Sequence, residues 1–75
     1  MRRLSTKHLQ QFSQNVVRLR TEAGATQEIL AEKVGISSRY LQSIEAGQRW
    51  PSIGVLVHLR NALGCDWAEL FTRLR

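Results

Sequence analysis

A short stretch near the middle of the chain carries polar side chains along one face of a predicted helix. The outward positions on a helical wheel begun at Ser38 are polar and carry one positive charge: Ser38 at the flank, then Arg39, Gln42 and Ser43. Leu41 and Ile44 point the opposite way. Such a face can enter a major groove and form hydrogen bonds with base edges. For this helix alone an ordinary solvated face is the better explanation, but the turn before it and the basic charge of the chain reverse that preference.

Other residues have the character of phosphate contacts. Gln27 opens the preceding predicted helix, near the positive end of its dipole, where a phosphate oxygen could bind. Arg49 follows the predicted helix that begins at Ser38, where the chain would leave a DNA groove. We therefore expect Arg49 to contact a phosphate group. Residues 1–5 are predicted to form a flexible basic arm. Its Arg2 and Arg3 could touch phosphate, although a solvated terminus is the preferred explanation.

The residues that could support catalysis or bind a metal are few and scattered. His8 and His58 lie far apart in the sequence, and the single cysteine, Cys65, occupies a position typical of a core. No carboxylate pair is predicted near either histidine, and the chain has no glycine-rich phosphate loop and no metal-ligand spacing. We therefore predict no catalytic residues, no metal site and no cofactor, and we do not expect an enzyme.

The composition indicates one small folded domain with a basic surface. The chain has 75 residues, of which 43% are hydrophobic, and a formal net charge of +5. This length allows a single domain, residues 1–75, with one core, and the charge favours a polyanion as partner. No apolar run approaches the ~20 residues that a membrane span needs, and the first residues lack the apolar segment of a signal peptide. The expected location is the cytoplasm, with no membrane partner.

The stretch Gln27–Ala46 has the pattern of two short amphipathic helices joined by a sharp turn. Leu30, Ala31 and Val34 share one face of the first segment. Gly35 stands where that segment must end, at a position that favours left-handed backbone angles. Two helices joined in this way form a helix-turn-helix.

Three further helices complete the predicted fold, which is all-α with five helices. They span Thr6–Ala23, Ser52–Leu63 and Trp67 to about Leu74. Helix starts are marked by side chains that cap helices: Thr26, Ser37, Ser52 and an Asp66–Glu69 capping box. Arg20 and Glu45 each lie at the edge of an apolar stripe, and we expect them to form a partly buried structural ion pair.

Some apolar residues of these helices are predicted to form the core, and others exceed what the core needs. The predicted core consists of Phe12, Val16, Leu19, Leu30, Val34, Ile36, Leu41, Ile44, Leu56, Leu59 and Leu63. Trp50 is expected to cover this core as a lid rather than to serve a partner. The last two helices carry more apolar surface than so small a core requires. Part of it is predicted to form a homodimer interface: Val55, Val57, Trp67, Leu70, Phe71 and Leu74.

Four segments follow one another along the chain: RLRTEAG, TQEILAEKVGIS, SRYLQSIEAGQRWPS and ALGCDWAELF. Together they resemble the Xre/Cro-type helix-turn-helix regulators, which have the five-helix lambda-repressor-like fold. The resemblance runs from about Phe12 to Phe71. It implies that Gln27 contacts phosphate, that the outward residues of the second helix face bases, and that the loop of Gln48 and Arg49 grips the DNA backbone.

The same resemblance implies that the pairing of Arg20 with Glu45 is structural. The chain departs from the family pattern at Ile29, Trp50 and Arg60. An acid, a polar residue and an alanine, respectively, are usual there.

The implied function is that of a transcriptional regulator. It would bind double-stranded DNA as a homodimer on a roughly palindromic operator, like Cro, a small prophage regulator or a restriction–modification controller protein. RNA polymerase is a further partner such a regulator could have. The alternative is a DNA-binding antitoxin, or an adaptor that binds a toxin partner. Arg39, Gln42 and Ser43 favour DNA, since an adaptor would carry acidic or apolar residues on that face.

Overall fold

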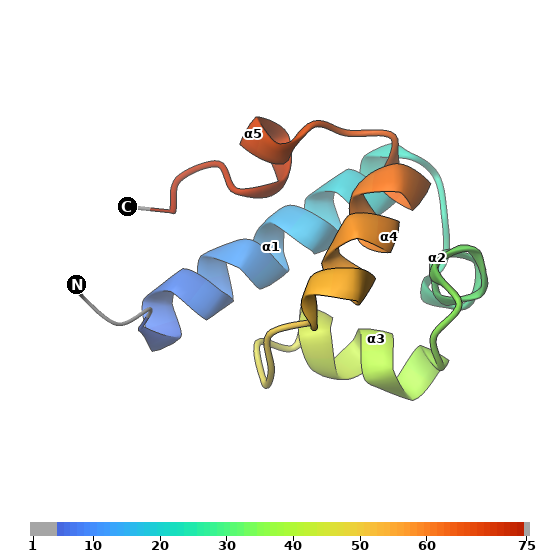
Figure 1. The fold of residues 1–75 in the computed structure, drawn as a ribbon, viewed down its shortest axis with the longest axis horizontal. Coiled ribbons are helices and arrows are strands. Elements are labelled where there is room, and N and C mark those ends of the chain that lie inside the picture. Colours follow the sequence, from blue (N-terminus) through green and yellow to red (C-terminus); the bar gives the residue numbers. More distant parts are fainter. Residues whose placement is uncertain (1–4, 75) are drawn as a thin grey trace.

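The computed structural model describes residues 5–74, which form five α-helices and no strand (Figure 1). The helices are α1 (Thr6–Glu22), α2 (Gln27–Val34), α3 (Ser38–Glu45), α4 (Ile53–Leu63) and α5 (Trp67–Leu70). α2 packs against α3 and α4, and α1 packs against α3 and α5. The all-α, five-helix prediction is confirmed. Arg2 and Arg3 of the predicted arm lie outside the described residues.

Short-range hydrogen bonds explain why the helices begin where they do. Each starts after a residue whose side chain accepts a hydrogen bond from the backbone N–H three positions on: Ser5, Thr26, Ser37, Ser52 and Asp66. The predicted caps and the Asp66–Glu69 capping box are therefore confirmed. Gly35 ends α2 with a left-handed φ of 84°, and only Gly35, Ile36 and Ser37 separate α2 from α3. This tight connection is the turn of the predicted helix-turn-helix.

The core draws side chains from all five helices. Its buried apolar members among the described residues are Phe12, Val16, Leu19, Leu30, Ala31, Val34, Leu41, Ile44, Leu59, Cys65 and Leu70. Full burial was wrongly predicted for Ile36, Leu56 and Leu63, which pack on the core but keep part of their surface in solvent. For Leu56 and Leu63 the reason is that α4 packs mainly against α2. A helix covered on one side buries one narrow stripe, and in α4 only Leu59 is fully inside.

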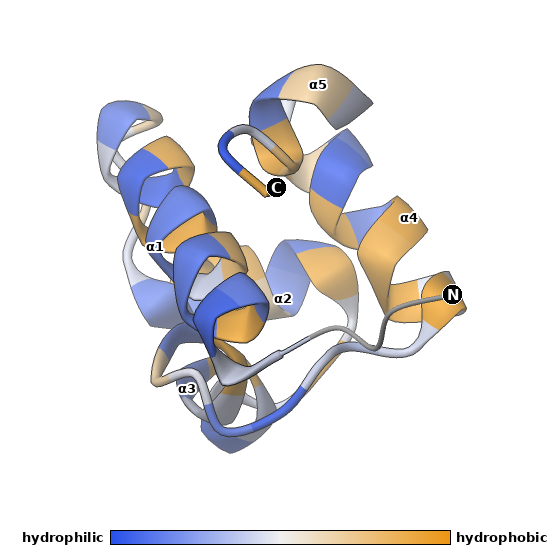
Figure 2. Cartoon of the chain, turned by 90° about the vertical axis from the view of Figure 1, so that its left-hand side faces the viewer, coloured by the Kyte–Doolittle hydropathy of each residue, from blue (hydrophilic) through white to orange (hydrophobic). Residues whose placement is uncertain are grey.

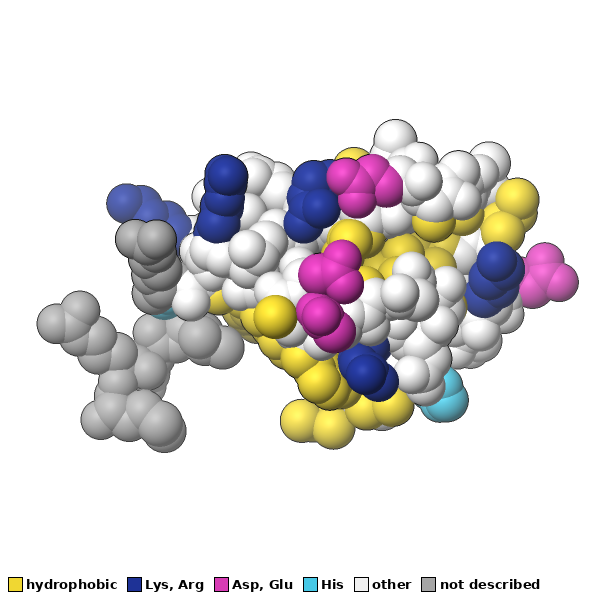
Figure 3. Space-filling view, turned by 90° about the horizontal axis from the view of Figure 1, so that it is seen from above, with side chains coloured by type: hydrophobic (Ala, Val, Ile, Leu, Met, Phe, Trp, Pro, Cys, Tyr) yellow, Lys and Arg dark blue, Asp and Glu magenta, His cyan; other side chains and the backbone are white. Residues whose placement is uncertain are grey.

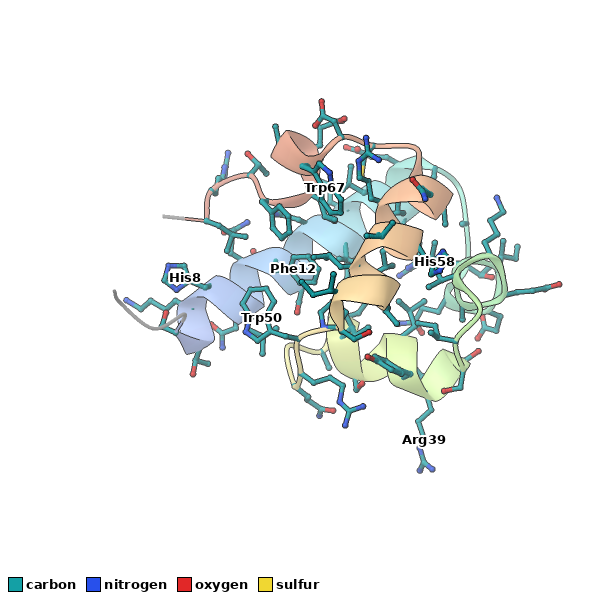
Figure 4. All side chains as sticks on the ribbon, in the orientation of Figure 1. His8, Phe12, Arg39, Trp50, His58 and Trp67 are labelled. Atoms are coloured by element: carbon teal, nitrogen blue, oxygen red, sulfur yellow. The ribbon has the colours of Figure 1, made fainter. Side chains whose placement is uncertain are left out.

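Aromatic rings lie in contact one after another through the molecule, one pair tilted and two pairs stacked. The ring centroids of Trp50 and Phe12 are 5.2 Å apart, and those of Phe12 and Phe71 are 5.8 Å apart. Trp67 continues the row, 5.8 Å from Phe71. Figure 4 shows Trp50 and Trp67 on either side of Phe12, which is completely buried. Trp50 is partly buried against the core, as a lid on the core would be, and its role as a lid rather than a partner contact stays a prediction.

The last helix is shorter than predicted. α5 ends at Leu70, and the expected continuation to Leu74 is wrong. The final carbonyl groups of a helix have no partner within it, and here Asn15 supplies the donors. Its buried Nδ2 donates hydrogen bonds to the carbonyl oxygens of Leu70 at 3.0 Å and Thr72 at 2.9 Å. Arg73 then takes a left-handed φ of 65°, which no continuing helix of L-residues adopts.

The predicted dimer interface needs one correction. Leu70 is 0% exposed, because it fills the core where α5 packs against α1, and it is not available to a second copy. Val57 and Trp67 are each 39% exposed. The remaining predicted members, Val55, Phe71 and Leu74, are partly buried. Figure 2 shows apolar residues over much of α4, and Figure 3 shows apolar side chains gathered at the surface beside charged ones.

Candidate nucleic-acid interface

One face of α3 packs against the core, and the opposite face is accessible to solvent. Leu41 and Ile44 are fully buried in the core. The predicted base-reading residues all keep exposed surface: Ser38, Arg39, Gln42 and Ser43. In Figure 4 the side chain of Arg39 extends away from the body of the molecule. The helix therefore has the geometry that a groove-reading helix needs, and base contact by these four side chains stays a prediction.

One of these residues already has a partner within the helix. Ser43 Oγ donates a hydrogen bond to the carbonyl oxygen of Tyr40, with 2.6 Å between the two oxygens. A hydroxyl has one donor and two acceptor lone pairs, so in this conformation Ser43 offers a base only an acceptor. The major-groove donors are the amino groups of adenine and cytosine. If Ser43 reads a base, as predicted, that base would be adenine or cytosine.

An open hollow lies between α3 and the loop that follows it. It is lined by Ser37, Arg39, Tyr40, Ser43, Gln48 and Arg49. The structure therefore brings two predicted base-reading residues together with both predicted phosphate contacts of the loop. Ser38 and Gln42 do not line the hollow, and neither does Gln27 at the start of α2.

Tyr40 is a member of this surface that the sequence analysis missed. The guanidinium carbon of Arg49 lies 5.2 Å from the centroid of the Tyr40 ring, in a cation–π contact. The Tyr40 hydroxyl also accepts a hydrogen bond from the backbone N–H of Ser52 at 3.4 Å. Tyr40 thus ties Arg49 and the start of α4 to α3. In the sequence, Tyr40 is only an aromatic residue directly after Arg39. Its position does not predict that the ring contacts Arg49.

The predicted ion pair between Arg20 and Glu45 is present. Arg20 donates from Nε to Glu45 Oε2 at 2.8 Å and from Nη2 to Glu45 Oε1 at 3.1 Å. Their side chains are 17% and 4% exposed, respectively, so the pair is largely buried, as expected. Gln27 joins it, since its Nε2 donates to Glu45 Oε1 at 2.9 Å. This contact was not predicted, and it connects a predicted phosphate contact to the end of α3.

The titratable groups of the described residues form no metal-binding cluster. Within residues 5–74, no three or more His, Cys, Asp or Glu side chains stand together where they could hold a metal ion. Burial, and next the nearby charge of Glu69, raises the pKa of the Cys65 thiol, which therefore stays protonated near neutral pH. In the same part of the chain no helix has both the length and the apolar character needed to cross a bilayer.

The fold and the accessible α3 define a helix-turn-helix protein, and comparison with known proteins identifies the family. The helix-turn-helix family HTH_3 matches residues 16–70, which include α2, α3 and the hollow. The chain is also 45% identical over 58 residues to the uncharacterized HTH-type transcriptional regulator y4dJ of Sinorhizobium fredii, covering 77% of this chain and 75% of that protein. The chain belongs to the Xre-type helix-turn-helix family of DNA-binding transcription regulators.

Solved structures of restriction–modification controller proteins have the same fold. The controller protein C.AhdI from Aeromonas hydrophila has a TM-score of 0.80 and 38% identity, covering 84% of this chain and 96% of its own. The controller protein C.Esp1396I, solved as a tetramer in complex with its natural 35 base-pair operator, has a TM-score of 0.76 and 30% identity. That match covers 88% of this chain and 87% of the controller chain.

Proposed function

We propose that this protein is a transcriptional regulator that binds a specific, roughly palindromic operator in double-stranded DNA as a homodimer. The observation that carries the proposal is the accessible polar face of α3, held by its buried opposite face and joined to α2 by a three-residue turn. The family to which the chain belongs supports the same function. The likeness to C.AhdI over almost all of that protein's length favours a controller of a restriction–modification system over a prophage regulator.

Base reading and backbone contact fall to different residues in this proposal. Base edges in the major groove are contacted by the α3 residues Ser38, Arg39, Gln42 and Ser43. Phosphate groups are contacted by Gln27 at the start of α2 and by Gln48 and Arg49 in the loop after α3. Since phosphate contacts carry no sequence information, the second group sets affinity and orientation and the first sets specificity.

A dimer would provide a larger contact area with DNA than a single recognition helix does. A single small module buries too little DNA surface for tight specific binding. Two copies related by a two-fold axis would place their α3 helices about 34 Å apart, in successive major grooves. We place the contact on the exposed side of α4 and α5. Its residues are Val55, Val57, Trp67, Phe71 and Leu74 from the predicted set, without the buried Leu70.

The proposal includes no catalytic activity and no cofactor. Double-stranded DNA as the partner implies that the protein works in the cytoplasm. RNA polymerase remains a candidate partner of such a regulator, and a toxin would be the partner under the antitoxin alternative.

Selection of bound sequences from a randomised duplex pool, followed by gel shifts at several salt concentrations, tests the proposal. We expect one enriched site with two half-sites of related sequence, bound far more tightly than random duplex. Random duplex should still bind weakly at low salt, because that contact is electrostatic. Binding that shows no sequence preference at any salt concentration would refute specific recognition. Absence of any DNA binding would favour the adaptor alternative.

A further inference from the structure

A set of hydrogen bonds connects α1, α2 and the end of α3. Both carboxylate oxygens of Glu45 accept from the guanidinium of Arg20, at 2.8 and 3.1 Å. The Oε1 atom of Glu45 also accepts from Gln27 Nε2 at 2.9 Å. Arg20 is held from its other side by the carbonyl oxygen of Ala25, 2.9 Å from Nη1. Gln27 is therefore fastened to the ion pair and is not a freely rotating surface side chain.

The bond to Glu45 determines how the Gln27 amide is turned. An ionised carboxylate only accepts hydrogen bonds, so Gln27 must direct its nitrogen, and not its oxygen, toward Glu45. The amide nitrogen carries two N–H groups, and Glu45 uses one of them. The described residues give the other N–H no hydrogen-bond partner, and Gln27 keeps part of its surface in solvent at the start of α2. Phosphate oxygens also only accept, so this N–H is the group of the Gln27 side chain that can bind DNA.

Arg20 makes this arrangement compatible with a polyanion. A lone carboxylate next to a phosphate would repel it, and because Glu45 is almost completely buried, water would weaken that repulsion little. Arg20 binds both oxygens of Glu45 and brings the net charge of the pair to zero. Glu45 can then hold Gln27 close to the DNA backbone without an electrostatic cost.

Resting on the DNA binding proposed above, we infer that Glu45 and Arg20 are positioning residues for the phosphate contact of Gln27. The pair joins α1 to α3, and it also holds the Gln27 amide before DNA arrives. A long side chain that is already ordered loses less conformational entropy on binding than a free one. The ion pair thus contributes to DNA affinity through Gln27 as well as to the fold.

The test removes the pair without leaving a buried charge. Arg20→Met combined with Glu45→Leu takes away the acceptor of Gln27 and leaves the net charge unchanged. Replacing a buried ion pair by apolar residues of similar size is often neutral or stabilising for the fold. We expect affinity for every duplex sequence to fall by up to about tenfold, because Gln27 then has to be ordered when DNA binds. Gln27→Ala alone removes the phosphate contact itself and should lose at least as much, and its effect should be smaller when the ion pair is already absent.

The matched control removes another ion pair of α1. Arg18 and Glu22 are paired at 3.4 Å on the surface, and Arg18→Gln with Glu22→Gln should leave DNA affinity unchanged. If the folded double variant at Arg20 and Glu45 binds DNA like the wild type, the pair is structural only and the inference is wrong. If the wild type itself binds no duplex, the proposed function fails first.

A measurement on the wild type decides the matter should the double variant not fold. In nuclear magnetic resonance spectra, the side-chain amide protons of Gln27 should exchange with water more slowly than those of the exposed Gln14. They should also shift when the selected duplex is added. Equal exchange in the two glutamines, or no shift with DNA, would overturn the inference.

Discussion

Arg39 and Arg49 both lie at the surface around α3, but they are held differently. Arg39 projects from the helix into solvent (Figure 4), while Arg49 lies against the ring of Tyr40 in the loop beyond. An arginine that projects from a recognition helix can form two hydrogen bonds with a guanine edge. An arginine held beside the helix is better placed for the DNA backbone. The two residues should therefore differ in their effect on specificity.

Replacing Arg39 by alanine should change specificity. We expect a loss of about 1–3 kcal/mol of binding free energy on the best site and a relaxed preference at one base pair in each half-site. The measurement is binding to the selected operator and to its single-base variants. An even loss across all variants would make Arg39 a backbone contact, and base reading would then rest on Gln42 and Ser43.

Replacing Arg49 by alanine should weaken binding to all sequences alike. One lost phosphate contact should lower the slope of log affinity against log salt by about one unit. The control is Arg18→Gln on α1, an exposed arginine outside the proposed interface. Titrations of specific and random duplexes at several salt concentrations measure both quantities. A change confined to the operator would show that Arg49 reads a base.

At the scale of elements, Asn15 connects α1 to the end of α5 and to the chain that follows it. Its Nδ2 binds two carbonyl oxygens at the end of α5, and its Oδ1 accepts from Gln11 Nε2 at 3.0 Å. All hydrogen-bonding capacity of the Nδ2 group is thus used inside the protein. A buried amide that is satisfied in this way joins α1 to the C-terminal segment and keeps Leu70 in the core.

Asn15→Ala should therefore destabilise the fold. The two carbonyl groups lose their donors and a cavity is left, and we expect the free energy of unfolding to fall by about 1–3 kcal/mol. Urea denaturation followed by circular dichroism measures the change. Gln14→Ala, at an exposed neighbouring position of α1, is the matched control and should have little effect. Equal stability of the two variants would show that Asn15 does not hold the end of α5.

At the scale of the whole molecule, most of the exposed large apolar side chains of the described residues belong to α4 and α5. Ile53, Val57 and Trp67 lie on these two helices, and Ile29 lies on α2. Val57 and Trp67 are each 39% exposed, and the guanidinium carbon of Arg60 lies 5.1 Å from the centroid of the Trp67 ring. Exposed apolar surface on a small protein commonly marks a site of association. In a two-fold dimer the same patch of each subunit meets its copy.

Val57→Asp should abolish the dimer without unfolding the subunit, since Val57 is partly exposed and Leu70 is not. Sedimentation at high micromolar protein concentration should then give the monomer mass, and DNA binding should lose its cooperativity. His58→Asp places the same new carboxylate at the next, exposed position of α4 and should leave the dimer intact. A dimer that persists in Val57→Asp would move the interface to another surface.

Sequence alone determined the features that depend on short-range contacts. Each helix cap bonds a backbone N–H three residues away. Gly35 takes the left-handed angle that its position predicted. The pairing of Arg20 with Glu45 is the one long-range contact that was predicted, from two charges at the edges of apolar stripes. Residue types and helical periodicity were enough for these, because within a helix the neighbours of each side chain are known in advance.

Only the tertiary structure decided which distant residues meet. Asn15 contacts carbonyl oxygens more than fifty positions away, at Leu70 and Thr72. That contact lies where α5 ends, short of the Leu74 that the sequence pattern predicted. The meeting of Gln27 with Glu45, and that of Arg49 with Tyr40, likewise depend on how helices and loops pack. Periodicity specifies which face of a helix is apolar, but side-chain partners are set by the angle and distance at which the elements cross.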